Sequence, residues 1–201
     1  MRYVRIMLTI MSQFLRTFLI GLMFCVFALP VHAADAPEAA APCLACHAVD
    51  GPAADAVTPL VAGLRKKHVL AAMQDYRSGE RLHEEMQQAA QGLDDAALDV
   101  LAAWYSEQPW IASERPVDSD LAKAGSRKAR ASCSSCHRRS GEGGIGAPRL
   151  AGQSVDYLVA ASTAYRDGGR TSPAARGKGF VMGDLTDDEI LALSHYYASL
   201  R

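Results

Sequence analysis

The feature that most constrains this chain is a short pattern, Cys-x-x-Cys-His, that occurs twice. The first copy consists of Cys43, Cys46 and His47, and the second of Cys133, Cys136 and His137. One helical turn brings the two thiols of a copy to the same face, where both can bond the vinyl groups of one haem. The histidine that follows then lies under the iron as its proximal ligand. The sequence therefore predicts two covalently bound haem c groups.

Two other interpretations of the cysteines explain less. A disulfide within each motif would use both thiols but would give the histidine no role. A zinc site with two cysteine pairs usually brings the pairs within about 15–20 residues of each other. Here the first pair ends at Cys46 and the second begins at Cys133, so the pairs lie much farther apart. Two copies at corresponding places of a repeat also argue against a chance match.

The two motifs belong to a longer internal repeat. Four further short segments of the first half recur in the second half in the same order. They pair residues 62–63 with 151–152, 76–79 with 165–168, 93–95 with 185–187, and 104–105 with 196–197. Such ordered matches indicate a duplicated domain. We expect a first domain over residues 34–107, a linker over 108–117 and a second domain over 118–201.

Both halves carry helical patterns after the motif. We expect one helix over residues 67–76 with a counterpart over 155–165, and closing helices over 94–106 and 186–200. The closing helices begin with acidic and hydroxyl side chains that suit a first turn, and their apolar residues recur at helical spacing. No strand-like alternation is visible. The predicted fold class is all-α, with two tandem helical domains, each wrapped round one covalently bound haem.

Residues 1–33 have the composition of an export signal. They contain three arginines and no acidic residue, and their apolar run over residues 18–29 ends at Pro30, before small residues up to Ala33. This order is typical of a cleaved signal peptide and predicts a mature protein in the periplasm, without Cys25. A spanning helix needs about 20 apolar residues, and the uninterrupted run is shorter. An uncleaved anchor and a peripheral membrane association stay open.

Each motif histidine needs a partner that fixes its ring, commonly a backbone carbonyl. Pro59 and Pro148 follow His47 and His137 at similar spacing. Their carbonyl groups are the candidate acceptors.

A methionine thioether on the sixth iron position closes a haem site and raises its reduction potential. Met86 precedes Leu93, at the start of the first closing helix, by seven residues, and we expect it in a loop that can reach the far face of the haem. Met73 lies in a helical pattern and is interpreted as a core residue. His68 and His83 are interpreted as solvated side chains.

The same count gives a different residue in the second half. Met182 is the only methionine there, yet it precedes Leu185 by three residues, and the position seven residues before Leu185 is Lys178. A glycine-rich loop would bring Met182 to the iron, and we assign Met182 as the axial ligand. Lys178, or an open and exchangeable site, is the alternative. His195 lies within the closing helix and is predicted to face solvent.

Several segments, together with the two motifs, resemble a known family. They are Leu-Ala-Gly-Gln at 150–153, Tyr-Arg-Asp-Gly at 165–168, Leu-Thr-Asp-Asp-Glu-Ile at 185–190 and Tyr-Tyr-Ala-Ser-Leu at 196–200. The chain resembles the periplasmic dihaem cytochromes c of the c4 class, and it is similar to the cytochrome subunit of flavocytochrome c sulfide dehydrogenase. The resemblance spans nearly all of residues 34–201. It implies two tandem cytochrome c domains with histidine and methionine on each iron.

The resemblance implies an electron carrier rather than an enzyme. No set of side chains suited to acid–base or nucleophilic catalysis stands out. A formal net charge of −1 argues against a sequence-independent nucleic-acid binder. We expect redox partner proteins, such as a terminal oxidase or a dehydrogenase. The alternatives are an electron-transfer subunit of a periplasmic dehydrogenase or oxidase complex, and redox catalysis at an open second haem. The oligomeric state stays open.

The first half departs from the family pattern before its motif. The second half has a helical pattern over residues 121–131 that would cross the closing helix, whereas the first half has only the short, proline-containing stretch 34–42. Trp104 and Tyr105 therefore lack an obvious packing partner in their own half. We expect them to contact the second half or a partner protein.

Overall fold

Helices make up the regular structure of the described residues. The computed structural model describes residues 35–144 and 146–201, and within these ranges the only β-type pairing is an isolated bridge between Arg81 and Arg170. The predicted all-α fold class is confirmed. The signal peptide predicted over residues 1–33 lies outside the described residues. No helix of the described ranges combines the length and the hydropathy that a membrane span requires.

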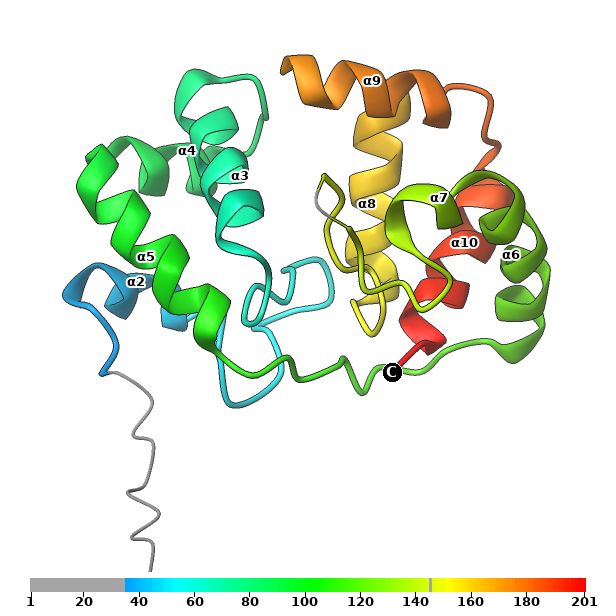
Figure 1. Ribbon diagram of the computed structural model, residues 1–201, viewed down its shortest axis with the longest axis horizontal. Helices are drawn as coiled ribbons and strands as arrows, with labels where there is room; N and C mark the ends of the chain where they lie inside the picture. Colours follow the sequence, from blue (N-terminus) through cyan, green and yellow to red (C-terminus); the bar gives the residue numbers. More distant parts are fainter. Residues whose placement is uncertain (1–34, 145) are drawn as a thin grey trace, which may run out of the picture. The chain divides into compact units, whose positions relative to one another are not determined.

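The helices of the two halves follow the same order after each motif (Figure 1). The first half contains η1 (Glu38–Ala40), α2 (Ala41–Leu44), α3 (Lys66–Ser78), α4 (Glu84–Gln91) and α5 (Asp95–Glu107). The second half contains α6 (Ser119–Ser132), α7 (Ser134–His137), α8 (Val155–Arg166), α9 (Pro173–Met182) and α10 (Asp187–Ser199). Helix α3 packs against α5, and α8 packs in the same way against α10. The packing therefore repeats along with the sequence.

The closing helices α5 and α10 begin where the capping residues predict. The carboxylate of Asp94 accepts from the N–H of Ala97 at 2.8 Å. The hydroxyl of Thr186 accepts from the N–H of Glu189 at 3.2 Å, and the Glu189 carboxylate accepts in return from the N–H of Thr186 at 3.1 Å. Side chains thus satisfy amide groups that the first turn of each helix leaves unpaired.

The expectation of loops around Met86 and Met182 is wrong, because α4 contains Met86 and α9 ends at Met182. Helix α4 is rich in Glu, Gln and Ala, which are good helix formers. Helix α9 begins with Ser172 as its cap and proline at its first position, an arrangement that favours a helix start. In α9 the favourable helix start outweighs the lower helix propensity of its two glycines.

The core of the second half depends on a close crossing of α6 and α10 (Figure 1). The helix predicted before the second motif is confirmed as α6. Gly125 lies at the crossing, and a methyl group at this position would overlap the backbone carbonyl of Ala192. Ala129 is 1% exposed and continues the same face of α6. Small residues therefore allow the two backbones to approach.

In the first half the closing helix α5 is covered by the short helices η1 and α2 instead of a long crossing helix. Trp104 and Tyr105 are buried and pack with Leu101 against Ala40 of η1, which is 0% exposed. Cys43 and Leu44 of α2 also pack against this cluster. The expectation that the two aromatic residues need the second half or a partner protein is wrong, because the short segment before the first motif supplies the contact.

Buried and surface hydrogen bonds join the two halves within the compact unit Ala36–Arg201. The Gln153 side chain accepts from the N–H of Leu60 and donates to the Leu60 carbonyl, both at 3.0 Å. Gln153 is 2% exposed. Beside the bridge at Arg170, the N–H of Thr171 donates to the carbonyl of Glu80 at 2.7 Å. Buried backbone groups need partners, and here one half supplies them for the other.

The close crossing of α6 and α10 can be tested by replacing a glycine at the crossing and, as a control, a glycine in open space. We expect the two replacements to change stability in opposite directions. Gly125→Ala should destabilise the haem-loaded protein by about 1–3 kcal/mol, because the added methyl group overpacks the crossing. Gly177→Ala in α9 should instead stabilise it by roughly 0.5–1 kcal/mol, since open space surrounds that position and alanine is the better helix former. Chemical unfolding followed by circular dichroism measures both. Equal stabilisation by the two alanines would refute the close crossing.

Candidate functional site

Each cysteine and histidine motif forms one turn of helix. In the first motif the N–H of His47 donates to the carbonyl of Cys43 at 2.8 Å, and in the second the N–H of His137 donates to the carbonyl of Cys133 at 3.0 Å. The second turn is α7. None of the four cysteines of the two motifs forms a disulfide. The backbone therefore gathers two thiols and one imidazole at each motif, as the spacing predicts.

A proline carbonyl fixes the ring of each motif histidine. The His47 Nδ1–H donates to the carbonyl of Pro59 at 2.9 Å, and the His137 Nδ1–H donates to the carbonyl of Pro148 at 3.0 Å. Both acceptors are those that the spacing indicated. With Nδ1 occupied in this way, Nε2 is the nitrogen that carries a free lone pair for a metal ion.

Burial keeps both imidazoles in the neutral form that binds metals. It lowers the pKa of His47, although the hydrogen bond to Pro59 acts in the opposite direction. Burial, followed by the positive charge of Lys178, lowers the pKa of His137 to about 4. Burial also raises the pKa of the Cys43 and Cys133 thiols. The described surroundings are therefore apolar enough to disfavour charge at both motifs.

The two methionines assigned as axial ligands occupy different environments. Met86 is half-buried and packs against the core cluster of the first half. Met73 belongs to that cluster and is 7% exposed, which confirms its interpretation as a core residue. Met182 is 6% exposed, lies in the core cluster of the second half, and lines a small hollow beside Cys133. The assignments of Met86 and Met182 as iron ligands stay predictions.

Lys178 meets the second motif directly. Its Nζ lies 2.9 Å from Nε2 of His137, the nitrogen left free by the bond to Pro148. The side chain is half-buried, and burial lowers the pKa of its amine. The position in the repeat was the only sequence signal for this contact.

Two of the three other histidines in the described residues have polar partners. His83 is exposed and lies 3.1 Å from the carboxylate of Glu85. His195 Nδ1 accepts from the N–H of Asp118 at 3.0 Å, at the start of α6. His68 differs from its interpretation as a solvated side chain, because burial, followed by the charge of Arg81, lowers its pKa to about 4.

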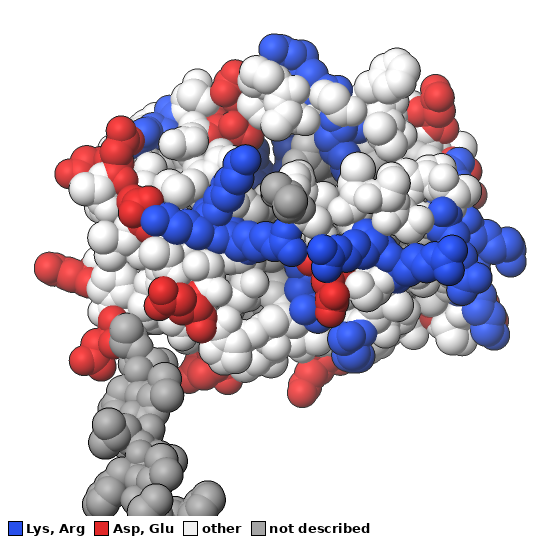
Figure 2. Space-filling view, in the orientation of Figure 1, with Lys and Arg blue, Asp and Glu red and all other residues white. Residues whose placement is uncertain are grey.

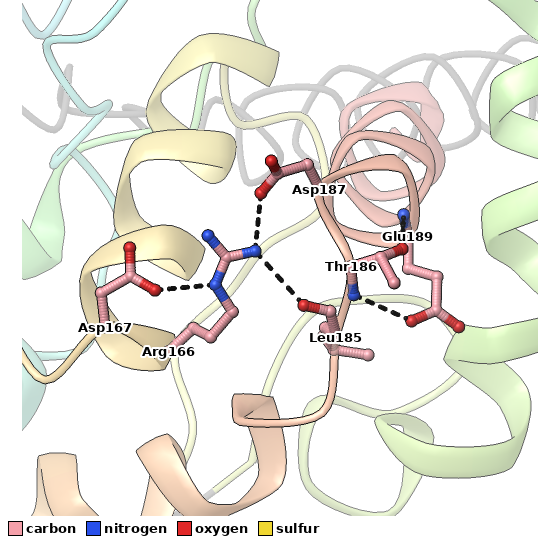
Figure 3. Close-up of polar contacts among 6 residues, drawn as sticks. All are labelled: Arg166, Asp167, Leu185, Thr186, Asp187 and Glu189. Atoms are coloured by element: carbon pink, nitrogen blue, oxygen red, sulfur yellow. Dashed lines mark hydrogen bonds and ion pairs between the residues drawn. The ribbon is translucent and has the colours of Figure 1, made fainter.

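An arginine holds the start of each closing helix. Figure 3 shows the Arg166 guanidinium between Asp167, Asp187 and the carbonyl of Leu185, at 2.8, 2.6 and 3.2 Å. Arg77, its counterpart in the repeat, donates to the carbonyl of Leu93 at 3.3 Å and to Asp95 at 2.5 Å. Each arginine lies in the last turn of the helix before α4 or α9, and the leucine carbonyl that it binds lies just after α4 or α9. We call each arginine with its leucine and aspartate partners an arginine clamp. Each clamp joins the two ends of the segment that contains a candidate axial ligand.

A second arginine pair, which sequence reasoning missed, lies between the halves. The guanidinium of Arg81 stacks on Tyr76 at 4.4 Å, and that of Arg170 stacks on Tyr165 at 4.3 Å. Arg81 also donates to the hydroxyl of Tyr157 at 3.3 Å, while Nε of Arg170 is buried without a hydrogen-bond partner in the described structure. The repeat of Tyr-Arg-x-Gly followed by a second arginine was the available signal. Two guanidinium groups so placed favour an anionic ligand.

Basic side chains also gather on the surface. Figure 2 shows lysine and arginine side chains in a band across the face turned toward the viewer. Arg138 and Arg139, directly after the second motif, are exposed. Arg65 is exposed as well and donates to the carbonyl of Gly144 in the loop that follows that motif. Surfaces of this kind speed encounters with acidic partner proteins.

Comparison with known proteins extends these observations. The family described as Cytochrome c matches residues 122–201. The chain is similar to a thiosulfate dehydrogenase electron acceptor from Stutzerimonas stutzeri (strain A1501), with 33% identity over 176 residues and coverage of 82% of each chain. It is also similar to cytochrome c4 from Azotobacter vinelandii, with 31% identity over 186 residues that cover 81% of this chain and 86% of the other.

Solved structures have the same fold. The reduced recombinant cytochrome c4 from Pseudomonas stutzeri superimposes with a TM-score of 0.73 and 31% identity, covering 81% of this chain and 95% of that one. A thiosulfate dehydrogenase (TsdBA) from Marichromatium purpuratum gives a TM-score of 0.68 and 32% identity, covering 78% of this chain and 36% of that one. The similarity therefore extends over most of the chain.

The arginine clamp can be tested at Arg166. Arg166→Gln should lower the midpoint of thermal unfolding of the haem-loaded protein by a few degrees and speed amide exchange in α9, because it removes the ion pair with Asp187 at the start of α10 and the ion pair with Asp167 after α8. Arg127→Gln on α6 is the control, since Arg127 is exposed and lies on another helix. It should leave α9 unchanged. Equal effects of the two variants would contradict the clamp.

Proposed function

Because the chain belongs to the cytochrome c4 family of electron carriers, we propose that it holds two haem c groups and passes electrons between redox partners in the periplasm. The observation that carries this proposal is the repeated motif turn, in which a proline carbonyl fixes Nδ1 of each histidine and leaves Nε2 as the nitrogen that can bind iron. Residues 1–33 would act as the export signal, and domains over 34–107 and 118–201, joined by a linker over 108–117, would each hold one haem.

At the first site, Cys43 and Cys46 would form the two thioether bonds. His47 would bind the iron through Nε2, with its ring held by the Pro59 carbonyl. Met86 would take the sixth position, since the Arg77 clamp and the helix α4 fix the segment that carries it. A thioether in this position would favour the reduced iron and raise the potential of the site.

At the second site, Cys133 and Cys136 would form the thioether bonds, and His137 would bind the iron through Nε2. The Pro148 carbonyl holds the ring, and burial keeps the imidazole neutral. The sequence assigns Met182 to the sixth position, and that assignment stays a prediction. Haem iron, when bound, supplies one-electron redox chemistry by cycling between its ferrous and ferric states.

The paired arginines support the fit of this cofactor. Haem carries two carboxylates that need cationic or hydrogen-bonding partners when they are shielded from water. Arg81 is 9% exposed, Arg170 has an unpaired buried Nε, and neither forms an ion pair with a carboxylate of the described residues. We assign Arg81 and Arg170 as partners of the haem carboxylates. The negative charge of the carboxylates would neutralise the two guanidinium groups between the two halves.

A second candidate function places the chain in a partnership with a dehydrogenase. The relative from Stutzerimonas stutzeri and another from Thiomonas intermedia are thiosulfate dehydrogenase electron acceptors, and the latter is 30% identical over 205 residues. The exposed basic side chains beside the second motif would suit an acidic surface on such a donor. In this role the chain would receive electrons released by oxidation of a sulfur compound.

The haem proposal is tested by counting haems in variants of each motif. We expect two haems in the native chain, measured by its intact mass and by the absorbance of the pyridine complex. The double variants Cys43→Ser/Cys46→Ser and Cys133→Ser/Cys136→Ser should each carry one, because a serine forms no thioether. The mass should also place the new N-terminus near Ala34. A native chain without bound haem would overturn the proposal.

The dehydrogenase partnership is tested by rapid mixing. The oxidised protein should be reduced by a thiosulfate dehydrogenase with thiosulfate, and the rate should fall as ionic strength rises, because salt screens the attraction between charged surfaces. Arg138→Glu/Arg139→Glu should slow the reduction, whereas Arg130→Glu on α6 serves as the control. Rates that are equal in all three proteins and independent of salt would exclude this docking surface.

A further inference from the structure

We propose that Lys178, through its Nζ, is the sixth iron ligand of the second haem, in the position that Met86 takes at the first. The inference rests on the proposed attachment of haem at Cys133 and Cys136. It replaces the sequence assignment of Met182 with a nitrogen ligand and makes the two haems chemically unequal.

The repeat places Lys178 opposite Met86. Each closing helix follows a leucine whose carbonyl is held by an arginine clamp, Leu93 by Arg77 and Leu185 by Arg166. Counting back seven residues from these fixed points reaches Met86 in α4 and Lys178 in α9. Both arginines bind the corresponding leucine carbonyl and the aspartate two residues later, so the register is set by structure as well as by sequence.

The contact with His137 supports the assignment directly. The bond from Nδ1 to Pro148 leaves Nε2 as the coordinating nitrogen of His137, and the side chain that meets Nε2 is Lys178, with Nζ at 2.9 Å. The contact is a hydrogen bond between the amine and the nitrogen through which His137 would bind iron, so the two nitrogens would have to separate to admit the metal. The flexible four-carbon stem of lysine allows the amine to adjust to an iron in this place.

The surroundings of Lys178 lack the carboxylate that a half-buried ammonium group would need. Three other lysines of the described chain pair with carboxylates: Lys66 with Asp99, Lys123 with Asp120, and Lys128 with Glu189. In the described residues no such ion pair occurs at Lys178, and its recorded side-chain contact is with Nε2 of His137. A neutral amine bound to iron would avoid the cost of burying an unpaired charge, because the bond to iron would replace the hydration that the amine loses.

Met182 already has a structural role. It is 6% exposed and belongs to the apolar core cluster with Leu185, Leu193 and Tyr197. It also borders the hollow beside Cys133, so it lies near the second site.

A nitrogen ligand changes the electron chemistry of the second site. An amine stabilises ferric iron more than a thioether does, whereas methionine raises the potential. The second haem should therefore have the lower potential, and an electron that enters there would move toward the first haem. The order of electron flow would follow from one residue that differs between the two repeats.

The test uses the full haem-loaded protein and substitutions that conserve side-chain size. Lys178→Met should move one of the two steps of a redox titration to higher potential and double the near-infrared band of oxidised iron bound to methionine sulfur. Met182→Leu should change neither. Lys67→Met on the exposed surface of α3 is the control for loss of a lysine, and Met86→Leu should abolish the sulfur band of the native protein.

Two results would overturn the assignment. Loss of half of the sulfur band in Met182→Leu, with no change in Lys178→Met, would make Met182 the ligand. A second haem that binds carbon monoxide at once in the reduced native protein would indicate an open site. Haem counting separates these outcomes from failure of the proposed function, because a chain with haem at the first motif alone would overturn both proposals together.

Discussion

The hydrogen bond from each motif histidine to a proline carbonyl is the constraint on which the rest of the structure depends. It joins the motif turn to the loop that follows, through His47 and Pro59 in one half and through His137 and Pro148 in the other. A few residues later each loop is bound to its closing helix, since Gly63 donates to Tyr105 and Gly152 donates to Tyr197. The imidazole, the loop and the last helix therefore form one unit in each half.

The two halves share this unit but differ in the helices that cover the closing helix and in the segment that precedes it. The second half packs the long helix α6 across α10, whereas the first half covers α5 with the short η1 and α2. The segment between the arginine clamp and the closing helix also differs, since the second copy is longer and exchanges a methionine for a lysine at the corresponding position. Duplication thus preserved the support of each site while the distal side diverged.

The sequence predicted what local chemistry determines. The motif turn, the proline acceptors and the caps at Asp94 and Thr186 follow from residues that lie near one another in the chain, and all are confirmed. Helices α4 and α9 were missed because α4 is short, with Met86 as its one large apolar side chain, and α9 contains two glycines. The stacked Arg81 and Arg170, and the contact of Lys178 with His137, depend on segments brought together by the fold. Spacing alone does not encode such contacts.

The amide of Gln153, which pairs with both backbone groups of Leu60, has a consequence for the timing of electron exchange. Its two buried hydrogen bonds oppose rotation of one half against the other. Rotation would leave the Gln153 amide and the Leu60 backbone groups without hydrogen-bond partners in a buried interface. For the proposed carrier, the separation between the two redox centres is then constant on the timescale of tunnelling. Exchange between them would be independent of solvent viscosity, and only the encounter with outside partners would be limited by diffusion.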